Sequence, residues 1–211
     1  MSRIKKTLED AQNVLKNLQF HSINDALFFV DSIEKATRLE IGKKVVEFLS
    51  NPNLVNALIE VAELYGDNEE ILEKTLWSLS QISTRGFWAI RQYNDYNYDF
   101  DSVTPKIYNL FLKYRNIPNN DGIRLTISEG IIELPEFEEF PEKWEYIISL
   151  ANIVPQKKSL KVFRYFVGKN IENIPDNIKD SIRIILNSYL DETSLDITTR
   201  KLYEDTVSRI E

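Results

Sequence analysis

Two amphipathic helical patterns of similar length follow one another in residues 53–83, and this passage constrains the fold more than any other. In each pattern apolar residues recur every three to four positions, and the breaker Gly66-Asp67-Asn68 separates the two. The stripes consist of Leu54, Leu58, Val61, Ala62, Tyr65, Leu72, Leu76, Leu79 and Ile82. Glu70 follows Asp67 at the spacing of a capping box, which predicts the start of the second helix. Because a short antiparallel helix pair cannot cover its own apolar faces, this pair must stack against similar neighbours.

The same passage resembles one unit of an armadillo or HEAT repeat. The run Thr75-Leu76-Trp77-Ser78-Leu79-Ser80-Gln81-Ile82 resembles the end of an armadillo third helix. The resemblance implies an all-α fold, a right-handed α-solenoid of stacked helix pairs, which serves as a binding scaffold. We expect helix pairs to begin near Asn53, Val103, Pro141 and Pro175. These starts are about 50, 38 and 34 residues apart, which brackets the roughly 40–47 residues of this repeat class.

The spacing of these starts predicts a single α-helical repeat domain over residues 1–211. Its parts would be N-terminal capping helices at 1–52, a repeat with a Tyr/Asp insertion loop at 53–102, repeats at 103–140 and 141–174, and C-terminal capping helices at 175–211. With 6 Gly and 7 Pro, the chain has too few turn residues for an all-β protein. An irregular helical bundle without repeat symmetry would show the same amphipathic spacing and is the alternative fold.

The net charge of -7 comes from the central part of the chain. Residues 53–150 hold 8 basic and 17 acidic residues, whereas each flanking segment has a net charge of +1. A field of one sign favours a basic partner and argues against direct binding of nucleic acid. The alternative is that the acidic residues only keep the protein soluble.

Aromatic and acidic residues alternate after residue 87, in a stretch without helical spacing that we interpret as an inserted loop. Tyr and Trp are enriched in binding hot spots, and carboxylates beside them can pair with basic residues of a partner. A second acidic and aromatic run follows at 133–145, and it would extend the binding surface if it shared a face with the loop. The predicted partner-binding residues are Trp88, Tyr93, Asp95, Tyr96, Tyr98, Asp99, Asp101, Glu136, Glu138 and Glu139. The alternatives are that the rings cover the end of a helix pair and that the acidic run is a solvated connector.

Few residues in the chain point to catalysis or to a cofactor. His21 is the only histidine and there is no Cys, which excludes thiol nucleophiles and thiolate metal sites. The sequence has no GxSxG, GxGxxG or P-loop motif. Asp95 to Asp99 match the first positions of an EF-hand loop, but Phe100 replaces its Gly and Lys106 replaces its bidentate Glu. We therefore expect no enzyme, no cofactor and no metal, although a carboxylate-based enzyme is a third functional class.

These observations predict a non-catalytic, protein-binding helical repeat protein. The most concrete version is a bacterial immunity protein that neutralises a basic toxin domain, such as a nuclease, because the chain is similar in general character to such small, acidic, Cys-free proteins. The alternative is an adaptor that holds a peptide in its concave groove, where Trp77 and Gln81 would imitate one rung of an armadillo groove. Acidic residues interrupt the N-terminus before an apolar segment can form, and no apolar run approaches about 18 residues. We therefore expect a cytoplasmic protein without a membrane span.

Overall fold

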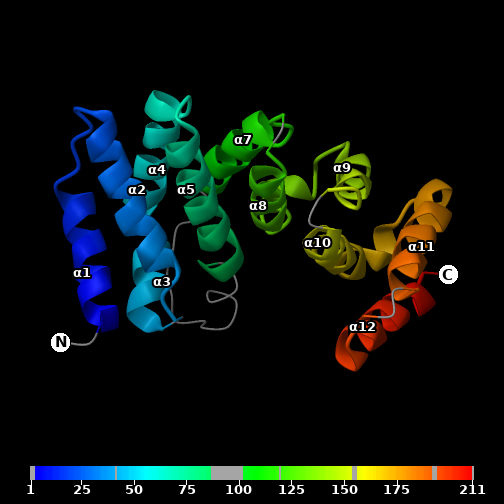
Figure 1. Cartoon of the computed structure of the whole chain (residues 1–211). Coiled ribbons are helices and arrows are strands. Elements are labelled where there is room, and N and C mark those ends of the chain that lie inside the picture. Colours follow the sequence, from blue (N-terminus) through cyan, green and yellow to red (C-terminus); the bar gives the residue numbers. More distant parts are fainter. Residues whose placement is uncertain are drawn as a thin grey trace. The chain divides into compact units, whose positions relative to one another are not determined.

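The computed structural model describes residues 3–40, 42–86, 102–118, 120–153, 156–191 and 194–210. All regular secondary structure in these ranges is helical, and they contain no strand, which confirms the all-α prediction (Figure 1). The chain divides into two compact units, Met1–Glu139 and Phe140–Glu211. The boundary between the units lies beside Pro141, where a repeat is expected to begin. The assignment of the whole chain to one repeat domain stays a prediction.

Unit 1 consists of seven described α-helices and two short turns of other helical types. They are α1 (Arg3–Lys16), α2 (Ile23–Thr37), α3 (Lys43–Leu49), α4 (Pro52–Tyr65), α5 (Glu69–Gln81), the π-helical η1 (Ile82–Gly86), α7 (Thr104–Tyr114), α8 (Asp121–Ile131) and the 3-10 turn η2 (Pro135–Phe137). Polar N-caps set four of the starts, because a side-chain oxygen accepts a backbone N–H that the helix leaves unpaired. These caps are Ser22, Asn51, Asn68 and Asn120.

The helices of unit 1 pack in two rows (Figure 1). In one row α1 contacts α2, α2 contacts α5, and α5 contacts α8. In the other row α4 contacts α7, and each of these two helices also packs against its own hairpin partner, α5 or α8. The apolar side chains between the rows are fully buried and include Phe29, Leu58, Leu76, Phe111 and Ile127. The hairpin of α4 and α5 therefore packs against the hairpin of α7 and α8.

The helix α8 lies close to α5 at Gly130. A Cβ atom at this position would lie 2.9 Å from the Cα of Ser80 on α5 and 2.8 Å from the ring of Phe111 on α7. Non-bonded carbon atoms prefer separations of about 3.5–4.0 Å, so a side chain here would push the two helices apart. The glycine inside α8 is thus required by packing.

Just after α5, the chain returns to the end of α2. Arg85 in η1 donates hydrogen bonds to the carbonyl oxygens of Thr37 and Leu39. Thr37 is the last residue of α2, whose final carbonyls have no partner within the helix. Burial lowers the pKa of the Arg85 guanidinium from its usual value. The contact fixes the ends of α2 and α5 to each other.

Unit 2 consists of α9 (Lys143–Leu150), α10 (Gln156–Lys169), the 3-10 turn η3 (Ile171–Asn173), α11 (Asp176–Leu190) and α12 (Ile197–Ser208). The rings of Trp144 and Phe166 join α9 to α10 edge to face, with centroids 5.1 Å apart. The rings of Tyr189 and Tyr203 join α11 to α12, with centroids 4.6 Å apart. Since α10 also contacts both α11 and α12, the four helices share one core. Among the described helices of both units, none has the length and apolar character to cross a membrane.

Candidate protein-binding site

The sequence-predicted binding residues are distributed between two parts of the chain. Trp88, Tyr93, Asp95, Tyr96, Tyr98, Asp99 and Asp101 lie outside the described residues. Glu136, Glu138 and Glu139 lie in or directly after η2, at the end of unit 1. Glu138 and Glu139 are exposed, whereas Glu136 is half-buried.

Glu136 makes an internal contact. Its Oε1 accepts a hydrogen bond of 2.6 Å from the hydroxyl of Thr104, in the first turn of α7. Burial raises the pKa of the nearby Tyr108 hydroxyl, an effect that Arg115 opposes and the charge of Glu136 reinforces. The Glu136 carboxylate thus ties η2 to α7, and of these three glutamates only Glu138 and Glu139 present their side chains openly to solvent.

Charged residues and one tryptophan lie on the outer sides of α2 and α5, which pack against each other. Asp31, Glu34 and Arg38 follow one another at intervals of three and four positions along α2 and its C-cap. Glu70, Lys74 and Trp77 follow one another at intervals of four and three positions along α5. Each set therefore lies on one side of its helix. Several residues between them in sequence are buried in the core, namely Ile33, Ala36, Leu72 and Leu76. We call this surface the α2–α5 strip, and it consists of Asp31, Glu34, Arg38, Glu70, Lys74 and Trp77.

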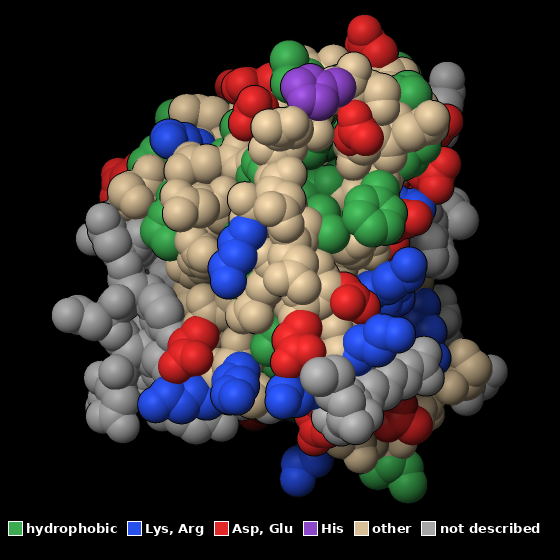
Figure 2. Space-filling view, turned by 90° about the vertical axis from the view of Figure 1, so that its left-hand side faces the viewer, with side chains coloured by type: hydrophobic (Ala, Val, Ile, Leu, Met, Phe, Trp, Pro, Cys, Tyr) green, Lys and Arg blue, Asp and Glu red, His purple; other side chains and the backbone are tan. Residues whose placement is uncertain are grey.

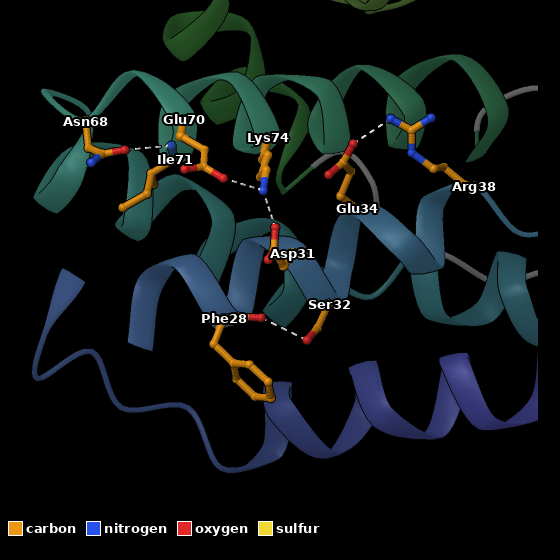
Figure 3. A network of polar contacts seen from close by, with 9 residues as sticks. All are labelled: Phe28, Asp31, Ser32, Glu34, Arg38, Asn68, Glu70, Ile71 and Lys74. Carbon is orange, nitrogen blue, oxygen red and sulfur yellow. Dashed lines mark hydrogen bonds and ion pairs between the residues drawn. The ribbon is translucent and has the colours of Figure 1, made fainter. Parts of the chain in front are cut away.

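Lys74 connects the two helices of the strip (Figure 3). Its ammonium group donates to a carboxylate oxygen of Asp31 on α2 and, at 2.7 Å, to Glu70 Oε1 one turn earlier on α5. The hydrogen bond to Asp31 is the main cause that raises the pKa of Lys74 well above its usual range, and the bond to Glu70 adds to it. Lys74 therefore stays cationic at physiological pH, and it neutralises part of the acidic charge around it.

At the other end of the strip, Arg38 covers the tryptophan. Its Nη2 donates to Glu34 Oε1 at 2.5 Å, and its guanidinium carbon lies 5.0 Å from the centre of the Trp77 ring. This distance is within the range of a cation–π contact. The Arg38 side chain is 59% exposed, so a partner can reach it and can move it away from the half-buried ring. Gln81 follows one turn later on α5 and is also half-buried.

Acidic residues extend the strip toward α8. Asn120 Nδ2 donates to Glu69 Oε1 at 2.9 Å and to Glu73 Oε1 at 3.0 Å. The side-chain oxygen of the same residue caps α8 through the backbone N–H of Ile123. Glu69, Glu70 and Glu73 are all exposed. The first two turns of α5 therefore present three carboxylates to solvent, held in place by Lys74 and Asn120.

The net charge of the chain belongs to unit 1. Residues 1–139 hold 15 Lys and Arg against 22 Asp and Glu, and residues 140–211 hold 11 of each. Figure 2, which shows the α1 end of the molecule, has its Lys and Arg side chains mainly in the lower half. Residues 1–52 have a net charge of +1, so the acidic surplus of unit 1 comes from residues 53–139.

Sequence reasoning missed most of the α2–α5 strip. It found Trp77 and Gln81 through the armadillo resemblance, and the spacing of Glu70 and Lys74 is a readable i,i+4 ion pair. The pairing of Lys74 with Asp31 joins positions 43 residues apart. Only the packing of α2 against α5 reveals that contact.

The described residues offer little for catalysis. No group of three or more His, Cys, Asp and Glu among them is arranged to hold a metal ion. His21 is exposed, and its Nε2 forms a hydrogen bond of 2.9 Å with Gln19 Oε1. The arrangement of the α2–α5 strip suits recognition by charge and by an aromatic ring.

Comparison of the chain with protein-family models, with curated proteins and with solved structures finds no match.

Proposed function

We propose that this protein is a non-catalytic, protein-binding helical repeat protein that recognises a basic protein partner. The observation that carries the proposal is the concentration of the whole net charge of -7 in unit 1. Exposed carboxylates of unit 1 stand on the first turns of α5 and after η2, where Glu138 and Glu139 lie. Such a surface attracts a basic partner over a distance and speeds their association.

The proposal includes a right-handed α-solenoid of HEAT or armadillo type for the helical stack. Support comes from unit 1, where the hairpin α4–α5 lies beside the hairpin α7–α8. The helices that correspond in the two hairpins are in contact, α4 with α7 and α5 with α8. This is the neighbour-to-neighbour packing of repeat proteins, which build extended binding surfaces from successive helices.

The most concrete form of the proposal is a bacterial immunity protein acting in the cytoplasm. Its carboxylates would cover the basic cleft of a toxin domain, such as the nucleic-acid-binding cleft of a nuclease. Electrostatic steering can raise association rates to about 10⁸–10⁹ M⁻¹s⁻¹ at low salt. Fast capture suits a protein that must neutralise a toxin before it acts.

A second candidate is an adaptor that binds a peptide along the α2–α5 strip. The observation that favours it is the contact of Arg38 with the ring of Trp77. An extended peptide could stack an apolar or cationic side chain on this ring once Arg38 turns away. The carboxylates of Glu73 and Glu70, one and two turns before Trp77 on α5, would pair with basic residues of the same peptide.

The experiment measures the affinity of the full chain for the basic domain encoded immediately upstream of its gene, by titration calorimetry at 50 and 200 mM NaCl. Charge reversal at Glu138→Lys and Glu139→Lys should weaken binding at least tenfold and flatten its salt dependence. Glu204→Lys on α12 makes the same charge change in unit 2 and should alter the affinity less than twofold.

The outcomes separate the two candidates. If Trp77→Ala abolishes binding while the double reversal leaves it intact, the adaptor is favoured over the immunity protein. If no basic domain is encoded upstream, the immunity form of the proposal is wrong. If neither set of variants weakens the binding of a basic partner, the acidic surface of unit 1 is not its binding site.

A further inference from the structure

The helix α10 has the largest net positive charge among the described helices of this acidic chain. Its 14 residues contain five cations and no acidic residue. Lys157, Lys161 and Lys169 are exposed, and Lys158 and Arg164 are half-buried. The other side of the helix is apolar and buried, through Leu160, Val162, Phe163, Phe166 and Val167. We call the outer side of this helix, from Lys157 to Lys169, the α10 basic face.

The lysines at the start of α10 do not serve the stability of the helix. Lys157 and Lys158 stand in the first turn, and no acidic residue accompanies them there. The N-terminus of a helix carries a partial positive charge and favours acidic residues, so these lysines oppose helix formation. The helix is held instead by its buried side, where Phe166 packs against Trp144 of α9. The exposed Lys157 and Lys161 on the outer side are open to a partner.

An aromatic side chain lies among the cations. Tyr165 is 41% exposed although its ring is large and apolar. It follows Arg164, whose guanidinium carbon lies 5.7 Å from the centre of the Tyr203 ring on α12. Tyrosine and arginine are the residue types that dominate protein-binding hot spots, and the face combines them with flanking lysines. Its composition fits recognition of an acidic protein surface.

We propose that the α10 basic face binds a short acidic segment of a partner protein. The helix is about 21 Å long, since each residue adds about 1.5 Å, and a segment of similar length meets only its positive charges. A nucleic acid strand would extend past the helix end and meet the acidic residues that follow, Glu172, Asp176 and Asp180. The acidic residues after α10 therefore favour a short acidic protein segment over a nucleic acid strand.

This surface goes beyond the function proposed for unit 1. It belongs to unit 2, it has the opposite charge, and it would recognise a different partner segment. Failure of one proposal leaves the other intact, because charge reversals in α10 and after η2 affect separate contacts.

The test uses the full chain and three fluorescent probes in anisotropy titrations at 50 mM NaCl. The probes are a 14-residue peptide of Glu and Ala, the matching peptide of Lys and Ala, and a 15-nucleotide single-stranded DNA. The variant Lys157→Glu/Lys161→Glu should bind the Glu peptide at least tenfold more weakly than the natural chain, a loss of about 1.4 kcal/mol. Glutamates near this helix start suit its dipole, so the variant should stay folded, as circular dichroism verifies.

The control Lys201→Glu changes the same charge at an exposed site of α12, and the affinity for the Glu peptide should change less than twofold. An equal loss in the control and the α10 variant would show a diffuse effect of net charge and overturn the proposal. So would tighter binding of the DNA than of the Glu peptide, or no preference for the Glu peptide over the Lys peptide.

Discussion

The close approach of α5 and α8 at Gly130 makes Gly130→Ala an informative substitution. In most helix interiors this change is stabilising by about 1 kcal/mol, because alanine loses less backbone entropy on folding. Here the added Cβ meets the Cα of Ser80 at 2.9 Å and the Phe111 ring at 2.8 and 3.0 Å. The ring can tilt, but a backbone atom cannot move away without its helix. We therefore expect the sign of the substitution to be reversed.

The expected loss follows from these distances. The contacts are about 0.5–1 Å shorter than carbon atoms prefer, and overpacking of a core costs about 1–3 kcal/mol. Because α5 must shift as a whole, we place the cost at about 3 kcal/mol. The helix propensity of alanine offsets about 1 kcal/mol. Gly130→Ala should thus lower the free energy of unfolding by about 2 kcal/mol.

Gly168 provides the matched control for Gly130. It also lies inside a helix, α10, but a Cβ there would have no atom within 4 Å. Gly168→Ala should therefore raise the stability of its helix by about 0.5–1 kcal/mol. Urea unfolding followed by circular dichroism measures both variants, and hydrogen exchange assigns the changes to α5 and α8 or to α10. A Gly130→Ala protein as stable as the natural chain would refute the close packing of α5 on α8.

Three further predictions concern polar contacts. Arg85→Met leaves two carbonyls at the end of α2 unpaired, so it should lower the free energy of unfolding by about 2 kcal/mol in urea titrations. Arg85→Lys should restore only part of the lost free energy, because an ammonium group lacks the two-pronged geometry of the guanidinium. A double-mutant cycle with Lys74→Met and Asp31→Asn should give a coupling of about 0.5–1 kcal/mol that falls in 1 M NaCl, and a salt-independent value would contradict an exposed ion pair. Hydrogen bonds from the Thr199 hydroxyl and backbone N–H lower the pKa of Asp196. The contribution of this N-cap is therefore present above the unfolded-state pKa and is lost as the pH falls through the lower folded-state value. Hydrogen exchange in α12 should become faster as this contribution is lost. In Asp196→Asn, whose side chain caps the helix but does not titrate, hydrogen exchange in α12 should not show this pH dependence.

The sequence predicted the clearest helix pair closely, because its pattern is local. The predicted stretch of 53–83 corresponds to α4 and α5 with the break at Gly66. The cap was misassigned, since the side chain of Asn68, and not that of Asp67, accepts the N–H of Ile71. The α-helix ends at Gln81, and the chain continues through the π-helical η1 to Gly86. Tertiary contacts of Arg85 hold this turn, and no local pattern reveals them.

The candidate site was less accessible to sequence reasoning. The stretch predicted as a repeat at 103–140 contains the helices α7 and α8, but the reason for Gly130 inside α8 lies in α5. The excess of acidic residues in the centre of the chain follows from the order of the amino acids alone, so it could be located without the structure. The α2–α5 strip depends on which helices become neighbours, and that choice is set by the whole core.

The hydrogen bonds of Arg85 have a consequence for the order in which the chain is synthesised. The carbonyl of Thr37, the last residue of α2, leaves the ribosome 48 residues before Arg85, whose guanidinium donates a hydrogen bond to it. Until then water must solvate the end of that helix, so its final turn can fray. Nascent chains stalled before and after residue 85 should therefore differ in how readily a protease cuts near Thr37.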